Sequence, residues 1–310
     1  MITTINEYKN NKINHNLFQQ EEINLDELLI IDNSFDFIKE HKDIKCRVIN
    51  GNVKIVNLSR IPKWFRRIKI NGNFDCSRCN LTTLRGCPKI INGNFNCSHN
   101  QLISLEKAPH TVLKTFNCSY NQLSNLEFCP SNIGGKLSCN NNRITTLLGC
   151  PEILHNTFNC ADNLLTSIEF CPKEINGSFN CFKNNIISLD FSPKVINGSY
   201  SCGDNQLISL VGCPEKIGGS FYCYNNNLKY LTGCPKIIDG NFSCYHNELI
   251  SLVGCPEIID GYFNCSNNQL KAFVGGPKKV TGYFDCSNNL NTFPINKDNT
   301  LININGDIIN

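Results

Sequence analysis

The stretch Phe95-Asn96-Cys97-Ser98-His99-Asn100-Gln101-Leu102-Ile103-Ser104-Leu105 decides the fold, because close copies of it recur every 21 residues. We number each copy from its cysteine as position zero. A fixed period of this length is the signature of a solenoid, in which each repeat is one coil stacked on the next. The sequence therefore predicts eleven registered coils in one continuous body. Their cysteines are Cys76, Cys97, Cys118, Cys139, Cys160, Cys181, Cys202, Cys223, Cys244, Cys265 and Cys286.

Other positions of the repeat are as constant as the cysteine. Two residues before it stands an aromatic residue, with Leu137 as the exception, and six before it stands an aliphatic residue. Three residues after it stands an asparagine, replaced by Cys79 in the first copy. Leucine or isoleucine follows at the fifth and eighth positions in nearly every copy, as at Leu102 and Leu105. In the first ten copies a proline stands twelve residues after the cysteine, from Pro88 to Pro277, and in seven of them a second cysteine precedes it.

Each of these positions has a physical reason. Phenylalanine and cysteine two residues apart lie on the same face of a strand, so both are predicted to point into the core. The asparagine amide can pair with backbone groups where the strand turns away. A glycine four residues before the cysteine, as at Gly93, allows either a positive φ or a close approach of backbones. The Cys-Pro step favours short extended segments on the convex side.

The pattern resembles the leucine-rich repeat, whose core reads L-x-x-L-x-L-x-x-N/C-x-L. Here phenylalanine and cysteine replace the two strand leucines, the first aliphatic residue lies one position earlier, and Cys79 fits the N/C alternation. The short period is similar to the compact repeats of bacterial effector proteins. The sequence motif F-x-C-S-x-N-x-L-x-x-L-x-G-C-P is similar to that of repeat proteins of giant amoeba viruses of the mimivirus type. The resemblance covers residues 46–293 and concerns the fold rather than the function.

The expected fold is thus a β-rich solenoid with one short parallel strand per 21-residue rung and an irregular, extended convex side. Residues 1–45 are expected to form a tail and a helical cap, 46–293 the solenoid with a degenerate first repeat, and 294–310 a closing cap. The helix is expected within 21–42, with a start at Asn33-Ser34, which can cap free amides. The alternative is that this segment recruits a second partner.

Twenty cysteines raise the question of disulfides. Cysteines stacked in register would lie about 4.8 Å apart with parallel Cβ vectors, a poor geometry for bridging. We therefore expect reduced thiols that serve as small buried hydrophobic side chains. Reduced thiols, together with an amino terminus that lacks an apolar core, favour the cytoplasm, or the host cytoplasm for a viral protein.

Composition gives no reason to invoke nucleic acid or a membrane, since the net charge is +3 with 18% charged residues. The strongest basic run is 60–69, Arg-Ile-Pro-Lys-Trp-Phe-Arg-Arg-Ile-Lys. We interpret it as a turn whose Trp64, Phe65 and Ile68 pack on the core while its charges stay solvated. A phosphate-binding or nucleic-acid-binding patch is the alternative.

No arrangement of residues points to catalysis, a metal or another cofactor. Cys76 and Cys79 form a C-x-x-C pair, but both occupy repeat positions and no second pair stands at zinc spacing. The six histidines are scattered, and no phosphate-binding glycine loop stands out. The sequence therefore predicts a protein that is not an enzyme.

A concave binding face follows from the strand alternation. The positions three and one before the cysteine, and one and two after it, should point outward. In later copies they become aromatic, which predicts one strip that binds a protein partner. Stacking of these rings for stability is the alternative. The predicted binding residues are Phe182, Tyr222, Tyr224, Tyr245, His246, Tyr262 and Tyr283.

The function favoured by these features is a monomeric, non-catalytic scaffold that binds another protein on its concave face. The viral resemblance implies a viral protein that acts on host factors. The alternative is a structural, self-assembling protein or virion component.

Overall fold

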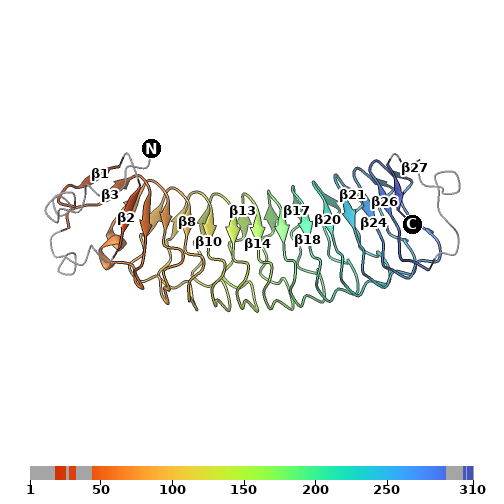
Figure 1. Cartoon of the computed structure of the whole chain (residues 1–310), viewed down its shortest axis with the longest axis horizontal. Coiled ribbons are helices and arrows are strands. Elements are labelled where there is room, and N and C mark those ends of the chain that lie inside the picture. The colour runs from red at the N-terminus through yellow and green to blue at the C-terminus, as the bar shows by residue number, and fades with distance from the viewer. Residues whose placement is uncertain (1–17, 26–27, 33–43, 291–302, 305, 310) are drawn as a thin grey trace. The chain divides into compact units, whose positions relative to one another are not determined.

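The computed structural model describes residues 18–25, 28–32, 44–290, 303–304 and 306–309. It divides into two compact units, the first made of Met1–Gln122 with Glu127–Gly134 and the second of Leu123–Leu126 with Gly135–Asn310. Each unit is a parallel β-solenoid in which strands one repeat apart are paired (Figure 1). The predicted solenoid fold is confirmed.

Every regular rung carries two short strands rather than the single one expected. In the first unit, one sheet holds β1 (Glu22–Asn24), β3 (Val48–Asn50), β5 (Lys69–Ile70), β7 (Ile90–Ile91), β9 (Thr111–Val112) and β11 (Asn132–Ile133). The other holds β2 (Leu29–Ile31), β4 (Val53–Ile55), β6 (Phe74–Asp75), β8 (Phe95–Asn96) and β10 (Phe116–Asn117). The even-numbered strands carry the aromatic residue of the repeat, and the odd-numbered strands carry its aliphatic residue.

The second unit repeats this arrangement. Its odd-numbered strands are β13 (Ile153–Leu154), β15 (Glu174–Ile175), β17 (Val195–Ile196), β19 (Lys216–Ile217), β21 (Ile237–Ile238), β23 (Ile258–Ile259), β25 (Lys279–Val280) and β27 (Asn303–Ile304). Its even-numbered strands are β12 (Leu137–Ser138), β14 (Phe158–Asn159), β16 (Phe179–Asn180), β18 (Tyr200–Ser201), β20 (Phe221–Tyr222), β22 (Phe242–Ser243), β24 (Phe263–Asn264), β26 (Phe284–Asp285) and β28 (Ile308–Ile309). Equivalent residues pair directly, so the 21-residue period sets the register.

The corner between the two strands of a rung explains the repeat glycine. A Cβ at Gly72 would lie 2.1 Å from the carbonyl oxygen of Gly51, and one at Gly93 would lie 2.3 Å from that of Gly72. Neither glycine has a positive φ. Of the two reasons considered for this position, the close approach of successive backbones is therefore the correct one.

The core is lined by the predicted phenylalanine, cysteine and aliphatic side chains. The ladder cysteines are at most 1% exposed, and the aromatic residues two positions earlier are fully buried. Neighbouring rings stack, with centroids 5.3 Å apart for Phe95 and Phe116 and 5.4 Å apart for Phe242 and Phe263. Burial of one such side chain contributes about 1.5–3 kcal/mol. Cysteine is small enough to fit beside each ring.

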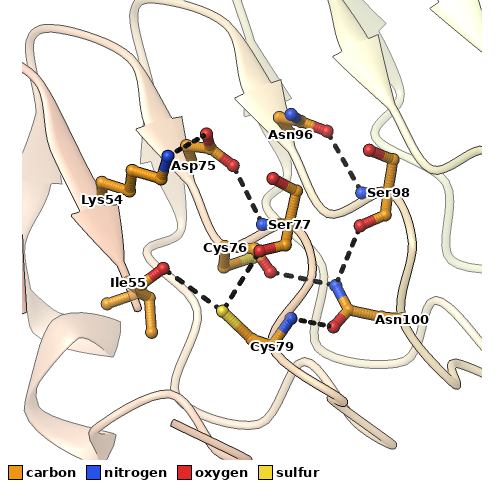
Figure 2. Close-up of polar contacts among 9 residues, drawn as sticks. All are labelled: Lys54, Ile55, Asp75, Cys76, Ser77, Cys79, Asn96, Ser98 and Asn100. Atoms are coloured by element: carbon orange, nitrogen blue, oxygen red, sulfur yellow. Dashed lines mark hydrogen bonds and ion pairs between the residues drawn. The ribbon is translucent and has the colours of Figure 1, made fainter. Parts of the chain in front are cut away.

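Asparagine side chains join each rung to the preceding one. Nδ2 of Asn100 donates to the carbonyl oxygens of Cys76 (2.9 Å) and Cys97 (3.0 Å), while its Oδ1 accepts from the amides of Cys79 (3.0 Å) and Leu81 (2.9 Å). These backbone groups lie where the chain leaves the strand and would otherwise be buried without partners. Figure 2 shows the bonds of Asn100 with the carbonyl oxygen of Cys76 and the amide of Cys79.

Cys79 reproduces the donor half of the asparagine. Its Sγ lies 3.2 Å from the carbonyl oxygens of both Ile55 and Ser77, so its single S–H is shared between two acceptors, which are the counterparts of Cys76 and Ser98 around Asn100 (Figure 2). The use of either asparagine or cysteine at this position of the leucine-rich repeat pattern thus has a simple basis here. A thiol can replace the amide donor, although it is a weaker one.

The amino-terminal end departs from the expected helical cap. The helical cap expected over 21–42 is not supported, because the described residues of β1 and β2 are strands that pair with β3 and β4. The helix start expected at Asn33-Ser34 lies outside the described residues. β27 and β28 pair with β25 and β26 at a spacing of 24 residues instead of 21. Short apolar segments at both ends therefore extend the solenoid by strand pairing.

The basic run 60–69 packs as expected for a turn. Residues Lys63–Arg67 form the short 3-10 helix η3, in which Trp64 and Phe65 are buried. The Trp64 ring stacks on Phe65 at 3.9 Å and meets the edge of Phe18 at 4.9 Å. This aromatic group extends the phenylalanine ladder, since Phe65 also contacts Phe74.

Two residues that depart from the repeat pattern, Tyr200 and Ser192, contact each other in the core. Tyr200 is the only tyrosine in the ladder of ring residues, and Ser192 is the only serine in the position that precedes the repeat proline. Their hydroxyl oxygens lie 3.0 Å apart, so Ser192 provides the partner that the fully buried Tyr200 hydroxyl requires.

Replacing this partner should destabilise the protein. Ser192→Ala is expected to lower the free energy of unfolding by about 1–3 kcal/mol, because it leaves a buried hydroxyl without that bond. Adding Tyr200→Phe should recover most of the loss. Urea unfolding of the two single variants and the double variant measures the coupling, and additive effects would contradict the pairing.

The asparagine ladder should be the least tolerant polar feature. Asn184 donates to the carbonyl oxygens of Cys160, Cys181 and Phe182, and it accepts from the amide of Leu165. Asn184→Ala removes all four bonds and should cost about 3 kcal/mol or more of unfolding free energy. Asn184→Cys should cost less because it keeps a donor. The exposed Asn227→Ala is the control and should change stability by less than about 0.5 kcal/mol. Equal losses for Ala and Cys at position 184 would refute the thiol argument.

Candidate aromatic binding surface

The seven predicted binding residues lie on the outer face of the even-numbered strands in the second unit. We call these seven residues the aromatic patch. Tyr222 ends β20, Tyr262 and Tyr283 immediately precede β24 and β26, and Tyr224 and Tyr245 follow ladder cysteines. All seven are half-buried or exposed rather than buried in the core. The predicted outward direction of these positions is therefore correct.

The patch consists of two rows rather than the single strip expected. In one row, Tyr224 stacks on Tyr245 with ring centroids 4.6 Å apart, and Phe182 lies 6.0 Å from Tyr224. The exposed ring of His246 meets the edge of Tyr245 at 5.3 Å. In the other row, Tyr262 stacks on Tyr283 at 4.9 Å. The rows are separate because one holds the position directly after the cysteine and the other the position three residues before it, which lie four residues apart along the chain.

Gly203 makes the first row possible. It occupies the rung between Phe182 and Tyr224, where a Cβ would lie 3.0–3.2 Å from atoms of the Tyr224 ring. Tyr224 therefore lies across the glycine and reaches Phe182 two rungs away. Sequence reasoning missed this role. The interruption of an aromatic column by one glycine was the signal that could have revealed it.

Tyr222 belongs to the second row through its hydroxyl. Burial alone would raise the pKa of Tyr222, but hydrogen bonds with the side chains of Ser220, Asn241 and Tyr262 outweigh burial and lower it. Burial and the shared hydrogen bond with Tyr222 raise the pKa of Tyr262. The two phenols thus form a polar link that spans two rungs and titrate as a pair.

Asp204 gives the patch an acidic edge. Burial first, and then the Asp204 carboxylate, raise the pKa of Tyr245, and the same carboxylate acts on Tyr224. The side-chain amide of Asn225 donates to Asp204 and holds it in place. The neighbouring cation, Lys183, is bound by Asp162 at 2.7 Å. Sequence reasoning did not single out Asp204.

A separate polar and aromatic row occupies the first unit. The guanidinium of Arg78 lies 3.4 Å from Nε2 of His99, and His99 stacks on Tyr120 with centroids 4.2 Å apart. Desolvation and the charge of Arg78 lower the pKa of His99. These residues occupy the position two after the cysteine, which has a φ of +48° to +55° in every regular copy. Sequence reasoning missed this left-handed position, because only six of its eleven residues are Asn or Asp.

The cysteines are arranged for packing rather than for nucleophilic chemistry. All twenty are free thiols. Burial raises the pKa of Cys118 and of Cys181 to about 12, which suppresses the reactive thiolate. Those that precede proline are less enclosed than expected: Cys87 is buried, but the six others are half-buried because their turns lie at the surface.

No three His, Cys, Asp or Glu side chains gather into a possible metal site anywhere in the described ranges. Among the same residues, no helix is long and apolar enough to cross a membrane.

Comparison with known proteins supports the fold. No family model matches the chain, and no curated protein matches it at a significant level. Among solved structures, YopM from Yersinia enterocolitica WA-314 superposes with a TM-score of 0.54 at 18% sequence identity. The match covers 85% of this chain and 64% of that protein. The fold is that of a leucine-rich repeat protein. At this identity, the likeness to YopM extends to the fold alone.

The raised thiol pKa values make the leucine-rich repeat core sensitive to alkali. A thiol ionises near pH 9 in the unfolded chain but at a higher pH when folded, so its contribution to stability is complete below pH 9 and is lost above it. At pH 10 the ionisation of each ladder thiol in the unfolded chain should lower the free energy of unfolding by about 1.4 kcal/mol. The eleven thiols together should lower it by roughly 15 kcal/mol, which is as large as the stability of a typical domain.

We therefore expect the urea midpoint to be nearly constant from pH 7 to 8.5 and to fall steeply between pH 9 and 10. Cys118→Ala should reduce this slope by about one proton. A midpoint that stays constant to pH 10.5 would contradict the burial of the ladder thiols.

Proposed function

We propose that the chain is a non-catalytic scaffold that binds a protein partner through the aromatic patch. The observation that carries the proposal is the grouping of four half-buried tyrosines, Tyr222, Tyr224, Tyr245 and Tyr262, on one outer face. Tyrosine supplies a large amphipathic contact area with little loss of side-chain entropy, and such residues dominate protein interfaces. Leucine-rich repeats and other solenoids characteristically present extended binding surfaces.

Stacking for stability is the competing explanation of the same rings. Cross-strand aromatic pairs contribute about 0.2–1 kcal/mol each, so the stacks of Tyr224 on Tyr245 and Tyr262 on Tyr283 would gain little from so much aromatic surface. The phenylalanine ladder inside the core already provides stacking along the axis. A binding role accounts for the concentration of tyrosines on the outward positions of the rungs from Cys223 to Cys286, whereas the first unit carries only the smaller row of His99 and Tyr120.

The finer proposal is that the chain is a viral protein that acts on host factors in the reducing host cytoplasm. Its support is the resemblance of the repeat motif to viral repeat proteins, together with twenty free thiols arranged as packing residues. A self-assembling structural role is the second candidate. It is favoured by exposed apolar side chains away from the patch, such as Phe191 at 53% and Ile208 at 72% exposure.

A capture experiment tests the binding role. The full chain, the Tyr222→Ala/Tyr224→Ala/Tyr245→Ala/Tyr262→Ala variant and a Tyr120→Ala/Tyr230→Ala control are immobilised under reducing conditions and exposed to an amoebal lysate. Tyr120 and Tyr230 are exposed tyrosines outside the patch. We expect the quadruple variant to lose at least 90% of the partner that the control retains.

Equal recovery by the quadruple variant would refute the patch as the binding surface, provided that circular dichroism shows both variants folded. Light scattering of the purified chain separates the second candidate. Self-association at micromolar concentration would favour the structural role, whereas a monomer would exclude it.

A further inference from the structure

The charges around the aromatic patch differ in sign from the chain as a whole. The chain carries a net charge of +3. On the outward positions of the patch rungs, from Cys181 to Cys286, the charged side chains are Lys183, Asp204 and Asp285, with histidine counted as neutral, and Lys183 is paired with Asp162 of the preceding rung. Asp260, at the corner before β24, is a further exposed carboxylate. The tyrosine-rich face is therefore acidic on a basic protein.

Both patch carboxylates are held in place by neutral donors. Asp204 accepts from the side-chain amide of Asn225, and Asp285 accepts from the amide (3.1 Å) and the hydroxyl (2.7 Å) of Ser287. Neutral partners orient a carboxylate but leave its negative charge in place. The adjacent ammonium of Lys183 forms its ion pair with Asp162 and feels the Asp204 carboxylate only as a weaker, more distant charge. Each carboxylate is thus fixed and can still pair with a cation.

The two carboxylates lie at opposite ends of the rungs that carry the patch tyrosines. Asp204 and Asp285 belong to rungs four repeats apart, which corresponds to roughly 19 Å at the usual spacing of paired strands. An extended peptide rises about 3.3 Å per residue, so some six residues would span this distance. Beyond Tyr245, the next two rungs carry only Ser266 and Ser287 at the equivalent position, which leaves that side of the ring uncovered by a larger side chain.

We propose that the aromatic patch binds an extended basic segment of a partner protein, with arginine or lysine side chains at Asp204 and Asp285. The inference rests on the proposed function and adds the chemistry of the partner. The tyrosine rings between the two carboxylates contact the apolar stems of these side chains and the backbone of the segment. A cation beside both a carboxylate and a tyrosine ring gains from charge pairing and from the ring quadrupole.

A single-stranded nucleic acid is the other ligand that stacks on rows of aromatic rings. Such ligands require a groove of lysine and arginine that follows the phosphates. Here Lys183 beside Phe182 is paired with Asp162, and the remaining charges among the rings are carboxylates, which repel phosphate. The sign of the charge therefore favours a basic peptide.

The probe is a fluorescein-labelled nonapeptide of Gly, Ser and Leu with arginine at positions 2 and 8. A matched peptide carries citrulline, which keeps the shape of arginine without its charge. Anisotropy is measured with the full chain in 150 mM salt and a reducing agent. We expect the arginine peptide to bind at least tenfold more tightly than the citrulline peptide, and the difference to shrink as salt is raised.

Asp204→Asn with Asp285→Asn is the decisive variant, because asparagine keeps the oxygen that accepts from Asn225 or Ser287. It should weaken binding of the arginine peptide at least tenfold and leave the citrulline peptide unchanged. Asp190→Asn, an exposed carboxylate outside the outward positions of the repeat, is the matched control and should bind like the wild type.

Three results would overturn the inference: equal affinity for the two peptides, no effect of the double Asp variant, or no binding of the arginine peptide up to 1 mM. Tighter patch-dependent binding of a twelve-nucleotide deoxythymidine strand would also overturn it. If the lysate partner depends on the tyrosines but not on Asp204 and Asp285, the proposed function stands and this inference fails. If the tyrosine variant captures the partner normally, the proposed function fails independently.

Discussion

The buried amide of the repeat asparagine is the interaction on which the other features depend. A coil of 21 residues must turn away from its strand inside the protein, where backbone groups have no water to pair with. Asn100 pairs with donors and acceptors of two successive rungs at once. The amide therefore fixes both the turn and the stacking distance. The same spacing then brings each phenylalanine over the next, and the core follows from it.

The outer face is free to vary because the inner face is so constrained. Side chains at the outward positions make few contacts that the fold requires, so serine, glycine, tyrosine and aspartate can all stand there. The aromatic patch uses this freedom in a limited part of the second unit. Its geometry still depends on the repeat, since only a regular stack lets Tyr224 lie across Gly203 and reach Phe182. Binding chemistry and folding chemistry are thus carried by different columns of one pattern.

Much of this architecture could be predicted from the sequence, because a residue repeated eleven times at one spacing must occupy one environment. The inward direction of Phe95 and Cys97 and the role of Asn100 followed directly. The second strand of each rung could not be predicted, since two residues such as Ile90 and Ile91 are too few to show the alternation of a strand. The strands near Ile23 and Ile30 were mistaken for part of a helical cap because they fall outside the 21-residue phase. Asp204 was missed because its importance comes from neighbours one and two rungs away, which no local motif displays.

The direction of the asparagine bonds has a consequence for biosynthesis. Each amide reaches backward, from its own coil to the one before it, as Asn184 does toward Leu165 and Cys160. A coil is therefore complete only when the following segment has left the ribosome. Translation supplies the segments in that order, so the coils of the growing protein can fold one after another as the chain leaves the ribosomal exit tunnel. Cys79, which lacks the oxygen of an asparagine, stands near the beginning of this series, where the first coils are closed.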